Sequence, residues 1–208
     1  MDEQPRARGL RVLVADEDAA SLESTAAVLG RLGHQVAAYA VSVPEAAERI
    51  ASEDPDLAVV AVHDDLEHAL DLVDEITESA SGPVVAVVEL GRGDFFSRAA
   101  ARGIAAFARS EDPDEVQGAI DVAMHRHATA AQLSAQVDQL ESALERRSLI
   151  ERAKGILMER HGVDDREAFR LLRDHARNRG RKVVDVAGAV TEGHALLLRG
   201  DRQHPDDR

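Results

Sequence analysis

Short apolar runs alternate with amphipathic stretches through the first half of the chain. The runs are close to five residues long and are rich in β-branched side chains or fully apolar; they lie at Leu10–Ala15, Val36–Tyr39, Leu57–Val62, Val84–Val88 and Ile104–Phe107. That length and composition are typical of parallel strands buried on both faces. Stretches with helical spacing separate the runs, at Ala19–Leu32, Pro44–Ser52, Leu66–Ser79 and Phe95–Arg102, and Asp112 can cap a further helix from Pro113. The alternation predicts an α/β doubly wound domain with a five-stranded parallel sheet.

A long helical pattern follows the last predicted strand. Between Glu115 and Gly155, Gly118 is the one residue that is Gly or Pro. Apolar residues recur there at steps of three and four, at Ala130, Leu133, Val137, Leu140 and Leu144. That spacing is typical of a coiled-coil seam. Because the other faces are mostly polar, the pattern favours a dimer-forming coiled coil over a single helix packed on its own domain.

The last part of the chain predicts three helices. They cover Leu149–Glu159, Asp164 to near Gly180, and Val183–Leu198. Gly162 ends the first of them, and Asp164 with Glu167 forms a capping box at the start of the second. The predicted organisation is therefore a tail at 1–8, an α/β domain at 9–126, a coiled-coil helix at 127–147, a small all-α domain at 148–200 and a tail at 201–208.

Composition narrows the class of protein. The chain is 44% hydrophobic and 31% charged, as in soluble globular proteins, and with 2% aromatic residues its core is expected to consist of Ala, Val, Leu and Ile. It has no cysteine, which excludes disulfides, thiolate zinc sites and a cysteine nucleophile. We expect a cytoplasmic protein without a membrane partner, because no apolar stretch of about 18 residues and no signal peptide is visible. No arrangement of nucleophile, base and oxyanion donors is visible either, so an enzyme is not expected.

Charge is distributed unevenly along the chain. The net charge of −14 argues at first against a nucleic-acid partner. Residues 148–200, however, hold 11 Lys and Arg against 8 Asp and Glu, whereas the rest of the chain holds 14 against 31. A modestly basic segment on an acidic carrier allows a phosphate-binding face without demanding one.

The second of the three C-terminal helices carries a series of arginines. Arg166, Arg170, Arg173 and Arg177, which we call the arginine row, are spaced four, three and four residues apart. At about 100° per residue they fall within roughly 60° of one another, on one face of the helix. The apolar residues Ala168, Phe169, Leu172 and Ala176 lie roughly opposite. Arg179, Arg181 and Lys182 extend the basic surface around the following turn, and Lys154 lies on the preceding helix.

Two interpretations of the arginine row are open. A solvated helix face is the common one, but such a face normally mixes signs and forms i, i+4 ion pairs. Arginine also suits phosphate, base edges and unpaired bases better than lysine does, which favours contact with nucleic acid. With Phe169 assigned to the apolar face, no aromatic stacking platform is expected, which excludes RNA-recognition and OB-type sheets.

Three segments of this region closely resemble the ANTAR domain of transcription antitermination regulators. They are Ile150–Met158 with its Ala-Lys-Gly motif, Glu167–Arg173, and Lys182–Ala187. The resemblance implies a three-helix module that binds paired small RNA hairpins in nascent transcripts and stabilises an antiterminator. It also implies that a receiver domain and a coiled coil can precede the module, and that dimerisation lets two modules engage two hairpins.

The resemblance assigns only some of the candidate RNA-binding residues. Ala153, Lys154 and Gly155 match the signature of the first helix, and Arg173 matches a basic position of the second. The other candidates come from the arginine row and its turn: Arg166, Arg170, Arg177, Arg181 and Lys182. Lys154 is open to two roles, contact with RNA or a structural ion pair, and Ala153 and Gly155 are open to a packing role.

The α/β part resembles response-regulator receivers, whose fold is flavodoxin-like. Receiver chemistry needs a carboxylate nucleophile, an acidic pair for Mg²⁺, a hydroxyl and a lysine. Asp16 and Glu17 keep the acidic pair, as a weak metal site or as relic or capping acids. The nucleophile position, however, is Ala61, the hydroxyl position is Val88, and the lysine position is Ser110, followed by Glu111. We therefore expect a pseudo-receiver without a cofactor, with Asp64 or Asp65 as the alternative acceptors.

The leading hypothesis is a dimeric RNA-binding antitermination regulator whose receiver-like domain does not accept phosphate at the usual position. A regulatory protein partner or a small ligand on the receiver face is compatible with it. The alternative is a protein-interaction module that scaffolds a signalling pathway and does not bind RNA. Binding of duplex DNA is a third option, since three helices can mimic a helix-turn-helix.

Overall fold

The computed structural model describes residues 9–16, 18–63, 65–88, 93–109 and 112–200. The predicted tails at 1–8 and 201–208 lie outside the described residues. The chain divides into two compact units, Met1–Gln132 and Leu133–Arg208.

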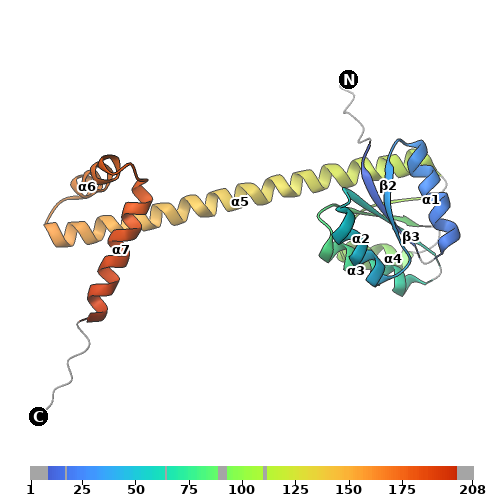
Figure 1. Cartoon of the computed structure of the whole chain (residues 1–208), viewed down its shortest axis with the longest axis horizontal. Helices are drawn as coiled ribbons and strands as arrows, with labels where there is room; N and C mark the ends of the chain where they lie inside the picture. Colours follow the sequence, from blue (N-terminus) through green and yellow to red (C-terminus); the bar gives the residue numbers. More distant parts are fainter. Residues whose placement is uncertain (1–8, 17, 64, 89–92, 110–111, 201–208) are drawn as a thin grey trace, which may run out of the picture. The chain divides into compact units, whose positions relative to one another are not determined.

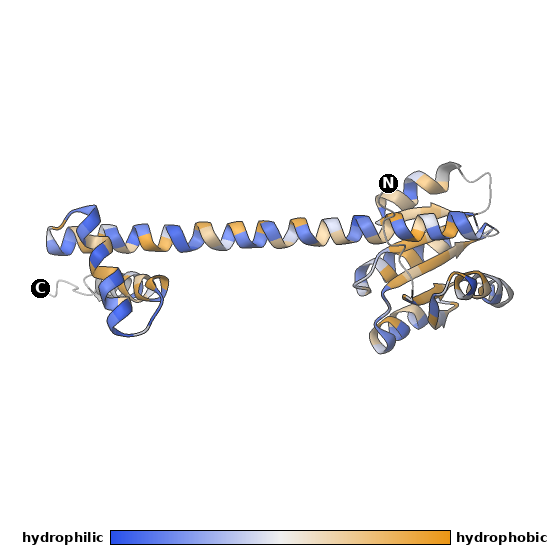
Figure 2. Ribbon diagram, turned by 90° about the horizontal axis from the view of Figure 1, so that it is seen from above, coloured by the Kyte–Doolittle hydropathy of each residue, from blue (hydrophilic) through white to orange (hydrophobic). Residues whose placement is uncertain are grey.

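The first unit is built on a parallel sheet of five strands. The strands are β1 (Arg11–Ala15), β2 (Gln35–Ala40), β3 (Leu57–Val62), β4 (Val84–Val88) and β5 (Ile104–Ala108), in the order β2-β1-β3-β4-β5. The strands β2 and β3 are labelled in Figure 1. The inner strands β3 and β4 are buried throughout, and the strands appear in hydrophobic colours in Figure 2. All five predicted strands are thereby confirmed, because each apolar run is long enough for one strand and apolar enough for burial on both faces.

Helices cover both faces of the sheet, as a doubly wound fold requires. They are α1 (Ala19–Arg31), α2 (Val43–Glu53), α3 (Leu66–Ser79), α4 (Gly93–Ala101) and the start of α5 (Pro113–His161). Along β1, Leu13 packs with α2, α3 and α4, whereas its neighbours Val12 and Val14 pack with α1 and α5. The alternation follows from successive strand side chains pointing to opposite faces. The predicted α/β doubly wound fold is confirmed.

The strand order reverses between β1 and β3, which leave their carboxyl ends side by side. β1 pairs with β2 on one side and with β3 on the other. In open α/β sheets the crevice at such a switch point is where ligands bind. Asp16 follows β1 and His63 follows β3, so their side chains define this end of the sheet.

The second unit contains three helical segments around a small core. They are the last part of α5, α6 (Asp165–Asn178) and α7 (Val183–Gly200). Its buried apolar residues, among those described, are Ala153, Ile156, Ala168, Leu172, Ala176, Val186 and Ala187. The prediction of a separate helix at Leu149–Glu159 needs one correction: this segment is continuous with the preceding helix, which the sequence predicts to form a coiled coil, and is the end of α5. One exposed glycine, Gly155, costs a helix only about 1 kcal/mol, which is not enough to end it.

The helix ends of the second unit have the predicted signals. Asp164 caps α6 by accepting a hydrogen bond from the amide of Glu167 at 2.8 Å. After α6, Gly180 has φ +62°, and the Arg181 amide donates to the carbonyl of Ala176 at 2.9 Å. This is a Schellman ending, which favours glycine at the left-handed position. Among the helices that the structure describes, none is long and apolar enough to cross a membrane.

Candidate nucleic-acid interface

The inward face of α6 fixes the direction of its outward face. Ala168, Leu172 and Ala176 are at most 2% exposed and lie within the core of the second unit. Since these positions are four residues apart, they form one stripe that is covered by the two other helical segments. The side chains on the far side of α6 are consequently exposed to solvent.

The arginine row occupies this exposed side. All four of its members are exposed, and the side chains of Arg170 and Arg173 are each 59% exposed. Arg170 donates to Glu167 at 2.6 Å, and this carboxylate raises the pKa of Arg170. Arg173 lies 3.5 Å from its neighbour Asp174. The row therefore has two members with a carboxylate partner and is less uniformly positive than its spacing suggests.

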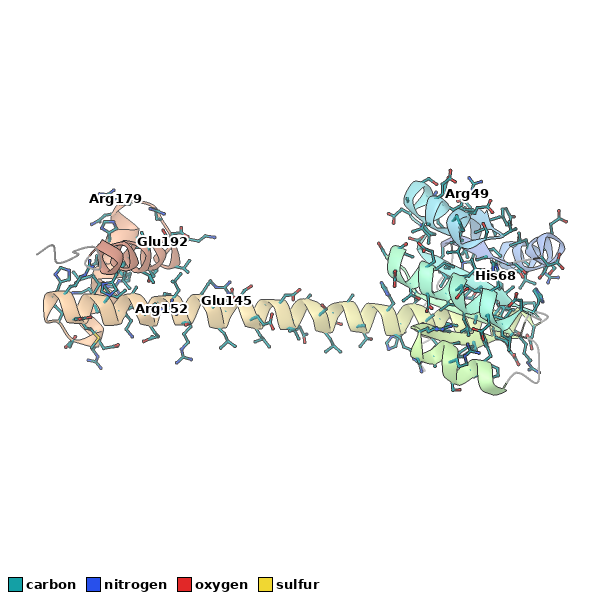
Figure 3. All side chains as sticks on the ribbon, turned by 90° about the horizontal axis from the view of Figure 1, so that it is seen from below. Arg49, His68, Glu145, Arg152, Arg179 and Glu192 are labelled. Atoms are coloured by element: carbon teal, nitrogen blue, oxygen red, sulfur yellow. The ribbon has the colours of Figure 1, made fainter. Side chains whose placement is uncertain are left out.

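Arg166 and Arg177 differ from the other two members of the row. Within the part of the chain that the structure describes, neither side chain makes an ion pair or a side-chain hydrogen bond. Arg181 and Lys182 are exposed in the following turn, as is Arg179, which is labelled in Figure 3. Among the described residues, exposed cations without an ion pair thus lie along α6 and at its carboxyl end.

Lys154 has a different environment from the rest of the basic residues. It is 8% exposed, and its Nζ atom lies 2.9 Å from Oε2 of Glu151 and 2.5 Å from Oδ1 of Asp165. Hydrogen bonds to Asp165 and then to Glu151 raise the pKa of Lys154. Since Asp165 begins α6, this geometry is that of a structural ion pair between α5 and the first turn of α6. Direct contact of Lys154 with RNA stays an untested prediction.

Phe169 corrects the assignment of the apolar face. It is 41% exposed and does not belong to the core of the second unit. On a helical projection it lies about 60° from Arg166, between the arginine row and the buried stripe. The sequence placed an aromatic ring inside the core, whereas the structure places it on the surface next to the arginine row.

An open groove lies on the other flank of α6. It has a volume of about 580 Å³ and is lined by apolar side chains of all three helical segments, among them Leu157, Leu171 and Val190. Arg181 and two histidines, His161 and His175, also line it. The groove and Phe169 are therefore on different sides of the same helix.

The predicted coiled-coil seam is exposed along α5. Leu133, Val137, Leu140 and Leu144 are 57%, 51%, 64% and 66% exposed. Large apolar side chains recur here at three- and four-residue steps with nothing packed against them among the described residues. That is the pattern of a helix face that a second helix can cover.

The switch point of the first unit holds a small cluster of polar side chains. Asp16 is fully buried, and its Oδ1 atom accepts a hydrogen bond from the amide of Asp18 at 2.9 Å. The Nε2 atom of His63 lies 3.1 Å from Oδ2 of Asp16 and 2.9 Å from Oγ of Ser21. A carboxylate only accepts hydrogen bonds, so Nε2 of His63 carries the N–H. This one N–H donates to Oδ2 of Asp16 and to Oγ of Ser21. A catalytic relay instead uses the two ring nitrogens for different partners.

Among the described residues, the nucleophile and the hydroxyl that receiver chemistry needs are absent from their usual positions. Ala61, the next-to-last residue of β3, and Val88, the last residue of β4, are buried and apolar. Asp65 caps α3, since its side chain accepts a hydrogen bond from the amide of His68. The other predicted positions, Glu17, Asp64, Ser110 and Glu111, lie outside the described residues.

The fold implies a Mg²⁺ site at this end of the sheet, and the donor set can be compared with that ion. Mg²⁺ requires near-octahedral oxygen ligands, usually including one or two carboxylates. Both oxygens of Asp16 already accept hydrogen bonds, and the residue at position 61 offers no ligand. No group of three His, Asp or Glu side chains suited to a metal occurs in the described part of the chain. The described residues alone do not supply the ligands of this ion, and Glu17 and Asp64 lie outside them.

Comparison with known proteins supports the division into two units. Residues 138–190 match the family model of the ANTAR domain. The transcriptional regulatory protein PdtaR of Mycobacterium tuberculosis is 29% identical over 183 residues, which are 88% of this chain and 89% of that protein. The nitrate regulatory protein of Klebsiella oxytoca is 40% identical over 65 residues, which are 31% of this chain and 16% of that protein.

Solved structures resemble the first unit in fold. The signal receiver domain of a modulated diguanylate cyclase from Desulfovibrio desulfuricans G20 has a TM-score of 0.51 at 17% identity, over 58% of this chain and 98% of that one. NtrX from Brucella abortus has a TM-score of 0.54 at 20% identity, over 70% of this chain and 35% of that one. Residues 138–190 therefore match the ANTAR domain, and the first unit has the fold of a response-regulator receiver.

Proposed function

We propose that this protein binds hairpins in nascent transcripts through its ANTAR domain and thereby favours transcription antitermination. The observation that carries the proposal is the arginine row on the outward face of α6. Its guanidinium groups are held on one side of a helix whose opposite stripe is buried. A row of cations on one face of a packed helix suits a phosphate backbone, and arginine can also contact unpaired bases. The relative from Mycobacterium tuberculosis, a transcriptional regulatory protein, supports a role in gene expression.

The proposed active form is a homodimer formed through the seam of α5. Exposed Leu133, Val137, Leu140 and Leu144 would be covered by the same residues of a second copy. Burying such side chains is favourable by about 25 cal/mol per Å² of apolar surface. A dimer carries two ANTAR domains and could engage two hairpins of one transcript, which raises affinity through effective concentration.

In this proposal the first unit does not act as a phosphate-driven switch. Position 61 lacks an acceptor carboxylate, Asp65 is committed to capping α3, and the carboxylate of Asp16 is committed to His63. The unit would then respond to a regulatory protein partner or act as a constant part of the dimer. Intact-mass measurement after incubation with a small phosphodonor and Mg²⁺ checks this: added phosphate would contradict it.

RNA binding by the full chain tests the main proposal. The probe is a two-hairpin RNA selected in vitro on the wild-type chain from a pool with randomised loops. We expect tighter binding to two hairpins than to one, weak competition by duplex DNA, and affinity that falls steeply with salt. Arg177→Ala should weaken binding about tenfold and lower the salt slope by about one, as loss of a phosphate contact does.

Arg49→Ala is the matched control, because it removes the same charge from an exposed helix of the first unit (Figure 3). It should leave the affinity and the salt slope unchanged. Equal effects of the two substitutions would show that the arginine row is not part of the RNA-binding surface. If the pool yields no RNA that the chain binds at low ionic strength, the RNA-binding proposal fails and the alternative of a protein-interaction module is favoured.

A further inference from the structure

Phe169 is an aromatic residue on the surface of the second unit, although the core of this unit consists mostly of small side chains. The chain has five aromatic residues, and Phe169 is the one that lies beyond residue 132. Among the described residues, four of the seven buried apolar residues of the second unit are alanines, at positions 153, 168, 176 and 187. Burial of a Phe side chain is worth roughly 1.5–3 kcal/mol, yet the residue stays 41% exposed. Core packing alone therefore does not explain this side chain.

Two arginines flank Phe169 on the helix surface. Arg166 lies three residues before it and Arg173 four residues after it. Side chains at these spacings are neighbours on a helix. Both arginines are exposed, and Arg166 has no ion pair among the described residues. The helix thus presents an aromatic ring between two guanidinium groups on its solvent side.

This arrangement suits an unpaired nucleobase with a phosphate on each side of it. Bases splayed out of RNA loops stack on aromatic side chains, whereas bases inside a duplex already stack on their neighbours. We propose that Phe169 stacks on an unpaired base of the bound RNA loop, while Arg166 and Arg173 hold the phosphates that flank this base. The inference rests on the proposed function and names the part of the hairpin that α6 recognises.

The charges around Phe169 favour a base over a second copy of this chain. If two copies met through this face, their arginine rows would approach one another. Like charges brought together across an interface cost free energy, which opposes such a contact. A loop of RNA brings negative phosphates to the same groups. The exposed ring and its flanking cations are therefore complementary to one ligand chemistry.

The test compares Phe169→Leu, Phe169→Trp and Leu171→Ala in the full chain, with the selected two-hairpin RNA. Phe169→Leu keeps most of the apolar area but loses the π-face, and should weaken binding roughly 5- to 100-fold with an unchanged salt slope. Phe169→Trp should restore the affinity. Leu171, at 39% exposure, is a matched apolar side chain on the groove side of α6, and its loss should leave affinity unchanged.

A fluorescent base locates the contact. With 2-aminopurine placed at each loop position in turn, wild type should quench one position and Phe169→Leu should not. If wild type binds RNA and Phe169→Leu binds it equally well, the stacking inference is wrong while the proposed function stands. Two other results would also overturn the inference. One is quenching that persists in Phe169→Leu. The other is a loss of affinity that Phe169→Leu causes by changing the oligomeric state, measured as the mass of the particle in solution. Failure of wild type to bind any RNA would overturn both.

Discussion

Among the described residues, each unit buries one side chain that is Asp, Glu, Lys or Arg. The groups that contact this charged side chain differ between the two units. In the first unit Asp16 is fully buried, and its carboxylate accepts from a backbone amide and from the ring of His63. In the second unit Lys154 is 8% exposed, and its ammonium contacts Glu151 and Asp165. These two carboxylates are themselves 56% and 65% exposed.

The difference lies in how much water reaches the partners. A buried group whose partner is removed pays its full desolvation cost, so the Asp16 cluster is expected to govern stability. An ion pair whose partners stand in water is screened and contributes little free energy. What Lys154 does instead is geometric, because it connects α5 with the first turn of α6. In the first unit the buried charge lies within a polar cluster with His63, whereas in the second unit it positions the first turn of α6.

The largest effect is expected when the partner of Asp16 is removed. His63→Ala leaves the buried carboxylate with one backbone donor, which should cost about 1–3 kcal/mol of stability. Urea unfolding can be followed by the fluorescence of Tyr39, which lies in β2 and is the single tyrosine of a chain without tryptophan. RNA affinity should not change, because the substitution lies in the other unit.

Two further variants control this prediction. His63→Gln keeps a side-chain N–H near Asp16 and should recover part of the lost stability. Ser21→Ala removes the hydroxyl but leaves the contact between His63 and Asp16 in place, so it should cost only about 0.5–1.5 kcal/mol. Equal midpoints for wild type and His63→Ala, or a larger loss in Ser21→Ala than in His63→Ala, would show that the carboxylate does not depend on the ring.

Much of the fold could be predicted because its signals are local. The five strands follow from apolar runs, and the ends of α6 follow from Asp164 and Gly180, each of which acts on its own few neighbours. The continuity of α5 through Gly155 could not be predicted as easily, because one glycine weakens a helix without ending it. The direction of the arginine row was predictable, since helical spacing alone decides which residues share a face.

The parts that could not be predicted depend on packing between distant segments. Asp16 and His63 are 47 positions apart, and the strand order brings them together. A search for receiver residues at their usual positions examines position 61, where the chain has Ala61, and does not examine His63. Phe169 lies at the edge of the apolar stripe, where exposure depends on how far the neighbouring helices reach. Periodicity gives its direction but not its cover.

The smallest effect is expected at Lys154, and it depends on pH. Hydrogen bonds to Asp165 and Glu151 raise the pKa of Lys154, so the folded unit holds this proton more tightly than the unfolded chain does. The resulting stabilisation is fully present below the ordinary pKa of a lysine and is lost as the pH rises through the raised value. Lys154→Met removes it at every pH. Because both carboxylates are more than half exposed, the difference from wild type near neutral pH should be small.

Alkaline titration of the full chain measures this directly. Lys154 and Lys182 are the two lysines of the sequence, so ¹³C labelling at Cε gives two NMR signals, which Lys182→Met assigns. The Lys154 signal should titrate at a higher pH in the folded chain than in urea. The urea midpoints of wild type and Lys154→Met should converge over the same pH range, while Lys182→Met follows wild type. If the Lys154 signal titrates at the same pH in both states, its ammonium is not held between α5 and α6, and the second unit has no counterpart to Asp16.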